Sequence, residues 1–175
     1  MAATFEWNED NGAATGSPSK GTTRNTAVTQ MNWKNTDDVS TAYSSSPITA
    51  GNNSYHKYQF GKFTGTFNQI LNGKWSPHTA GTLGTGLTLV GKVSSTYAAP
   101  ATSALGSSTD YTSIVAIGSG ATVNFATSGP ENASPTATLS AAGFTQYLIT
   151  QLQTSGSAAA GDTATVTGTL QYDEN

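Results

Sequence analysis

TATVTGTLQY, residues 163–172, is the stretch from which the fold class is best inferred. Its apolar residues and one glycine share a parity: Ala164, Val166, Gly168, Leu170 and Tyr172. The other parity holds four threonines and a glutamine. Because successive side chains point to opposite faces of a strand, the pattern predicts a strand of about ten residues with one apolar and one polar face.

An antiparallel partner for this strand is predicted upstream, in FTQYLITQLQ at residues 144–153. The small-residue loop 154–162 would join the two strands into the organising hairpin of the fold. Residues 144–153 also fit a helix, since apolar side chains recur at every fourth position (Phe144, Leu148, Leu152). The β-branched and aromatic residues between them favour a strand.

The rest of the chain contains several short runs with strand-like patterning. Further strands are predicted over residues 4–7, 27–33, 55–71, 87–97, 111–117, 121–125 and 136–139. In residues 55–71 the aromatic parity changes at Gly61-Lys62, which predicts a bulge or bend. Connecting loops are predicted over residues 8–23, 35–53, 72–86, 98–110 and 128–135. About ten strands without a convincing helix predict an all-β fold, an antiparallel β-sandwich of jelly-roll type.

The N-terminal segment has two interpretations. Residues 1–23 read as a short strand followed by a long loop, and residues 24–175 as a single sandwich domain. The segment could be an arm that lies across a neighbouring subunit, with Phe5 and Trp7 as apolar anchors at a partner interface. The other interpretation is an edge strand packed on its own sheet.

The composition predicts a thin core. Leu, Ile, Val and Phe number only 27 of 175 residues, a share that is typical of disordered chains. Disordered chains also carry high net charge, whereas this one has a net charge of only -3 and alternating strands. We therefore expect an ordered β domain that gains stability by burying apolar surface against copies of itself or a partner.

Several classes of function are disfavoured by what the sequence lacks. No cysteine is present for disulfides, thiolate metal sites or a cysteine nucleophile. No window approaches the roughly 18 apolar residues of a membrane helix, and the N-terminus does not resemble a secretory signal. The seven basic residues are scattered, so neither nucleic acid nor a membrane is an expected partner.

No catalytic, cofactor or metal residues are predicted. The spacing from Gly86 to Lys92 resembles a phosphate loop, but Val93 stands where a Mg²⁺-binding hydroxyl is needed. His56 and His78, the only histidines, lack a metal-ligand pattern around them and no nucleophile motif accompanies them. We expect His56 on the polar face of its strand and His78 exposed in a loop.

Acidic residues occur as three adjacent pairs, at 9–10, 37–38 and 173–174. Paired carboxylates can bind calcium or serve glycoside hydrolysis. Adjacent side chains on an extended chain point apart, however, so solvated loop charge is the main interpretation.

Five aromatic residues suggest a further alternative, a sugar-binding face: Trp33, Tyr43, Tyr58, Trp75 and Tyr97. Aromatic residues are more often part of a core or of a protein interface.

Two segments carry a resemblance to a known class of proteins. PITAGNNSYHKYQFGKFTGTFNQI at residues 47–70 and AGDTATVTGTLQYDEN at residues 160–175 resemble small structural proteins of tailed-bacteriophage virions, most nearly capsid decoration (cement) proteins. The resemblance implies a non-enzymatic protein that binds the major capsid protein on the capsid exterior after assembly in the host cytoplasm. It also implies self-association, often as a homotrimer. A tail, collar or baseplate component and a carbohydrate-binding adhesin module are the alternatives.

Overall fold

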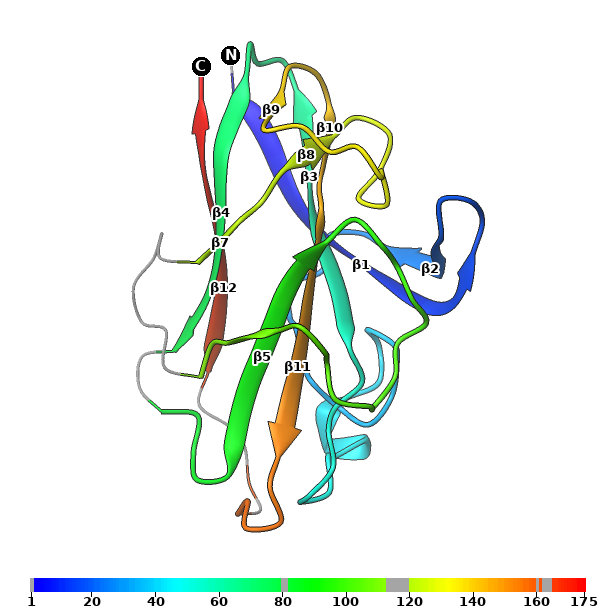
Figure 1. Cartoon of the computed structure of the whole chain (residues 1–175), viewed down its shortest axis with the longest axis vertical. Coiled ribbons are helices and arrows are strands. Elements are labelled where there is room, and N and C mark those ends of the chain that lie inside the picture. The colour runs from blue at the N-terminus through cyan, green and yellow to red at the C-terminus, as the bar shows by residue number, and fades with distance from the viewer. Residues whose placement is uncertain (1, 80–81, 113–119, 160, 162–164) are drawn as a thin grey trace.

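The described residues form two antiparallel β-sheets and no α-helix. The structure is a computed structural model and describes residues 2–79, 82–112, 120–159, 161 and 165–175. The strands form two layers (Figure 1). Apolar side chains from both sheets pack between them, so the predicted all-β sandwich is confirmed. The described part contains twelve strands, and its one helical turn is the 3-10 segment η1 (Tyr43–Ser45).

The larger sheet contains most of the strands. Its main path runs β2 (Lys20–Asn25), β1 (Ala3–Thr15), β3 (Lys57–Gly65), β11 (Tyr147–Thr154), β5 (Leu87–Ser94) and β6 (Thr109–Asp110). The short strand β10 (Gly143–Thr145) pairs with β3 and with β8 (Phe125–Ala126). The smaller sheet runs β12 (Val166–Glu174), β4 (Ile70–Thr79) and β7 (Ala121–Thr122), with β9 (Thr138–Leu139) also on β4.

The strand predicted at residues 163–172 is confirmed from Val166 onward, and residues 162–164 lie outside the described part. Its predicted partner is wrong. β12 pairs with β4, placing Leu170 opposite Trp75, whereas β11 lies in the other sheet between β3 and β5. The physical reason is burial: β11 is buried on both faces from Tyr147 to Leu152, which suits a central strand, while β12 is half exposed and forms an edge.

The segment 144–153 is extended, so its helical alternative is wrong. Gln146 interrupts it between β10 and β11, and its backbone N–H donates to the carbonyl of Asn124 at 3.0 Å.

The N-terminal strand is longer than predicted. β1 continues from Ala3 to Thr15 and pairs with β2, so the loop predicted over residues 8–23 is wrong. Its polar residues Asn8 to Asn11 were expected in a loop because of their composition, yet all four are buried between neighbouring strands.

Three further predictions are corrected. Residues 27–33 form no strand, and residues 70–79, predicted mostly as loop, form β4 with Trp75 buried. β3 pairs with β1 in continuous register, so the bulge at Gly61-Lys62 is absent. The ring of Phe5 lies over Gly61 and leaves no room for a side chain there, which explains the glycine. Residues 113–119 of the hairpin predicted over residues 111–125 lie outside the described residues.

The core has three parts. One lies between the sheets around Trp75, Leu89 and Leu148, and another at the end of the sandwich around Phe63 and Phe125. A third cluster lies on the outer face of the larger sheet, where the connection after β5 covers it: Tyr58, Phe60, Val90, Tyr97, Leu105, Tyr147 and Ile149. The small number of aliphatic residues is thus supplemented by aromatic rings in tilted and edge-to-face contacts.

Candidate functional site

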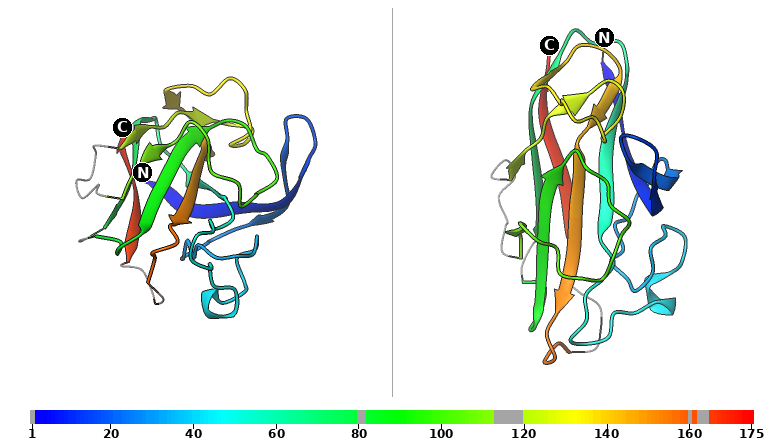
Figure 2. Two further views of the ribbon diagram at one scale, coloured as in Figure 1. Left: turned by 60° about the horizontal axis from the view of Figure 1, so that its bottom comes forward. Right: turned by 45° about the vertical axis from the view of Figure 1, so that its right-hand side comes forward.

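The β1–β2 hairpin extends away from the rest of the larger sheet (Figures 1 and 2). β1 pairs with β3 from Ala3 to Asp10 and with β2 from Glu9 to Thr15, so beyond Asp10 only β2 lies beside it. Residues 13–18, here called the hairpin tip, are all exposed. The tip is composed of small uncharged residues (AATGSP).

A fully buried ion pair lies at the root of this hairpin. Lys57 Nζ is 2.9 Å from Glu9 Oε1, and each side chain is only 1% exposed. The same carboxylate oxygen accepts a hydrogen bond from Asn11 at 3.0 Å, and the other accepts one from Gln59 Nε2 at 3.1 Å. Since burial of a charge is costly unless it is paired and hydrogen-bonded, this set of partners fixes where β1 lies on β3.

A second ion pair joins β1 to β2. Arg24 binds Asp10 through two hydrogen bonds of 2.8 and 2.7 Å, and its guanidinium lies 3.1 Å from Glu131. The hydroxyl of Tyr147 donates to Asp10 at 2.6 Å. Its hydrogen bond to Asp10 raises the pKa of Arg24, and burial raises the pKa of Tyr147 far above its ordinary value. Both groups therefore keep their protons at ordinary pH values.

The loop that follows β2 is tied to the same root. Lys34 is fully buried, and its Nζ donates to Asp38 Oδ1 at 3.0 Å. Burial acts to raise the pKa of Asp38, but hydrogen bonds from Thr41 and Lys34 outweigh it and hold that pKa well below its usual value. Asp37 accepts hydrogen bonds of 2.7 Å from Asn11 and from the backbone of Gly12. We call Glu9, Asp10, Arg24, Lys34, Asp37, Asp38, Lys57 and Glu131 the root network.

The interpretation of the acidic pairs as solvated loop charge is wrong for Glu9 and Asp10, which are buried in β1. The pair at 173–174 is exposed as predicted, but it lies at the end of β12 and not in a loop. One signal in the sequence could have indicated burial. Lys57 and Gln59 alternate with Tyr58 and Phe60 at the start of the most aromatic stretch of the chain, where a buried polar side chain needs a polar partner.

The two predicted interface residues lie on the inner face of β1. The ring of Phe5 packs 5.2 Å from that of Phe63 and 5.0 Å from that of Trp7, and Trp7 also packs against the core between the sheets. Both are half-buried in their own domain. Their role at a partner interface stays a prediction.

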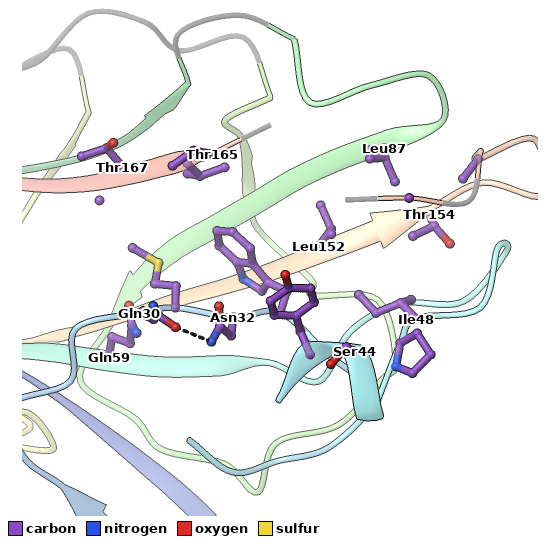
Figure 3. A pocket seen from close by; sticks show the side chains of 18 of the residues that line it. Gln30, Asn32, Ser44, Ile48, Gln59, Leu87, Leu152, Thr154, Thr165 and Thr167 are labelled. Atoms are coloured by element: carbon purple, nitrogen blue, oxygen red, sulfur yellow. Dashed lines mark hydrogen bonds between the residues drawn. The ribbon is translucent and has the colours of Figure 1, made fainter. Parts of the chain in front are cut away.

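A cleft of about 1170 Å³ opens between the sheets beside β12 (Figure 3). One wall is formed by Thr165 and the start of β12 to Gly168, and the opposite wall by residues 28–33, 43–44 and 47–50. Leu87 of β5 and Leu152 of β11 line the space between them. None of the 24 described residues around this cleft is Asp, Glu, Lys, Arg or His.

Several residues that line the cleft are held by side-chain hydrogen bonds. Trp33 donates its indole N–H to Thr150 at 3.0 Å, so the plane of its ring is set. Gln59 is only 5% exposed, and the donation from its amide nitrogen to Glu9 directs its carbonyl oxygen away from that carboxylate. Asn32 donates to Gln30 Oε1 at 3.0 Å on the opposite wall.

The five aromatic residues considered for a sugar-binding face lie in two different environments. Tyr58, Trp75 and Tyr97 are at least 96% buried, so for them the alternative interpretation as core residues is confirmed. Trp33 and Tyr43 line the cleft, and the Tyr43 side chain is 50% exposed.

No family model matches the chain, and no curated protein or solved structure is detectably similar to it. Within the described residues, no group of three or more His, Asp or Glu is arranged to hold a metal ion. None of the described helical segments could cross a membrane.

His56 and Lys92 make hydrogen bonds within the fold. The ring of His56 lies 2.9 Å from the carbonyl of Ser103, and burial lowers its pKa. The side chain of His78 lies outside what the structure describes. The spacing from Gly86 to Lys92 falls on β5, where Lys92 donates to the carbonyl of Gly106 at 3.1 Å.

Proposed function

We propose that this chain is a non-enzymatic structural protein of a tailed-bacteriophage virion, a decoration protein that binds the outer surface of the capsid. Its partner is the major capsid protein, and its action is to stabilise contacts between neighbouring capsid subunits. It associates with itself, as a homotrimer in the simplest arrangement. The single observation that carries the proposal is the projecting β1–β2 hairpin held by the root network.

This hairpin has the properties of a preformed attachment element. Association costs less conformational entropy when the binding segment is already ordered. The root network orders this hairpin through an ion pair to β3 and another between β1 and β2. The hairpin tip carries no charge and no bulky side chain, so another subunit can approach its backbone closely. Many copies on a shell would multiply a modest contact by avidity.

The test is co-sedimentation of the purified protein with empty capsids of the phage that encodes it. In a shortened variant, Asn-Gly replaces residues 15–20 and closes the hairpin at the Ala14–Gly21 pair with a two-residue turn. We expect full-length protein to saturate the capsids and the shortened variant to lose most of its occupancy. A matched control changes an exposed residue in another connection, Ala141→Asp between β9 and β10, and should bind as wild type does.

Two results would count against this function. Equal occupancy by the shortened variant would remove the hairpin from the attachment, and no occupancy by the wild-type protein would remove the capsid. Immunogold labelling of intact virions separates the alternatives, because label on the tail, collar or baseplate would identify a component of those parts. Light scattering of the free protein tests the homotrimer.

A further inference from the structure

We propose that the cleft beside β12 binds a neutral oligosaccharide. This inference is independent of the hairpin and of attachment to a capsid. It rests on the absence of charge among the described residues of the cleft, on its aromatic walls and on a mostly buried glutamine, Gln59, that lines it.

The size and charge of the cleft restrict the ligand. At about 1170 Å³ it exceeds the roughly 300–1,000 Å³ of typical small-ligand pockets, so it has room for several sugar units. A charged ligand would lose its hydration there without gaining a counter-charge from any described lining residue. The described walls therefore favour a neutral ligand over a charged one.

Its walls supply both kinds of contact that a sugar ring needs. The C–H faces of a sugar pack against aromatic rings, and the cleft presents Trp33 in a fixed plane and Tyr43 with half of its side chain exposed. Tyr43 makes no side-chain hydrogen bond with any other described residue, so its hydroxyl is available to a ligand.

Sugar hydroxyls need donors and acceptors at fixed positions. Gln59 Oε1 accepts no hydrogen bond within the described part of the chain, although the residue is 95% buried and borders the cleft. Its amide is held in place by Glu9, which is itself held by Lys57. On the wall that faces β12, Asn32 donates to Gln30. This bond leaves the amide nitrogen of Gln30 as a donor and the carbonyl oxygen of Asn32 as an acceptor. Hydroxyl groups of a sugar can satisfy all three groups.

An extended peptide is the other class of ligand that fits an uncharged cleft next to an edge strand. The fixed ring of Trp33 and the directed oxygen of Gln59 favour the sugar, because strand addition uses backbone groups and needs neither. Peptide binding is therefore one outcome of the test.

The experiment measures binding of neutral oligosaccharides by titration calorimetry, with tryptophan fluorescence as a second signal. The probes are hexasaccharides of the cello-, malto-, xylo- and chito- series, and oligogalacturonate is the acidic comparison. We expect at least one neutral probe to bind and the acidic one not to bind. Tyr43→Ala should weaken that binding on the order of tenfold, and the double variant Gln30→Ala/Asn32→Ala should weaken it by at least as much.

The matched control is Val39→Ala. Val39 is the other large apolar side chain that the described surface exposes, at 37%, and it does not line this cleft. It should bind the probe like wild type, and unchanged melting temperatures should show that all variants fold. The proposal is overturned if no neutral probe binds, if only oligogalacturonate binds, or if binding survives both cleft variants. Retention of uncharged peptides from a displayed library, without sugar binding, would overturn it as well.

Discussion

Lys57 Nζ lies 2.9 Å from Glu9 Oε1, and both side chains are almost completely withdrawn from water. This pair links β1 to β3, the strand that follows the long irregular segment after β2. Replacing one member leaves the other charge buried without its counter-charge. Because such a charge is costly, Glu9→Gln should lower the free energy of unfolding by about 3–5 kcal/mol. Denaturant unfolding measures the change.

An exposed pair on the same two strands provides the control. Lys62 Nζ lies 3.5 Å from Glu6 Oε1, and both side chains are about one third exposed. We expect Glu6→Gln to change stability by less than about 1 kcal/mol. The double variant Glu9→Leu/Lys57→Met should recover much of the loss, since it removes both buried charges. Equal effects of Glu6→Gln and Glu9→Gln would contradict this account of the hairpin root.

Asp38 should make stability depend on pH at the acid end. Its pKa is held well below the ordinary 3.8, so folding favours its charged form. The stabilisation is fully present above the unfolded pKa and is lost as pH falls through the folded pKa. Asp38→Asn should therefore melt below wild type by a constant margin at neutral pH, and the margin should shrink below about pH 4. A margin that stays constant down to the lowest accessible pH would exclude this role.

Gly21 of β2 lies against the backbone of β1. A Cβ at this position would lie 2.6 Å from the carbonyl oxygen of Asn11 and 2.9 Å from its nitrogen, and backbone atoms cannot move aside as a side-chain end can. Gly21→Ala should cost about 1–3 kcal/mol of stability, measured by thermal unfolding. Gly106→Ala is the control, because a Cβ there meets no atom within 4 Å, and it should be neutral or slightly stabilising.

The fold class follows from alternation, which is a local property of the chain. Val166, Leu170 and Tyr172 share the half-buried face of β12, as their parity predicts. Strand partners do not follow from alternation. β11 is buried on both faces, and the sequence contains no signal for which of several strands lies beside it.

The candidate site depends even more on contacts between residues that are far apart in the sequence. Glu9 and Asp10 have the local pattern of a loop, and only Lys57 and Arg24, brought next to them by the sheet, make burial of their charge favourable. The cleft brings residues 28–33 together with residues 165–168, which are far apart in sequence. Local composition cannot predict contacts of this kind.

A substitution of Phe5 tests whether this residue is part of the core or an anchor at a partner interface. Its ring packs on Phe63 and lies over Gly61, so its removal leaves a cavity in the domain itself. We expect Phe5→Ala to lower the free energy of unfolding by about 2 kcal/mol, less than for a fully buried ring because Phe5 is only half-buried. Capsid occupancy below the melting temperature should then be unchanged, whereas the shortened hairpin should lose occupancy and keep its stability within about 1 kcal/mol. Denaturant unfolding and co-sedimentation of both variants measure these effects separately, and loss of occupancy by folded Phe5→Ala would instead place Phe5 at the partner interface.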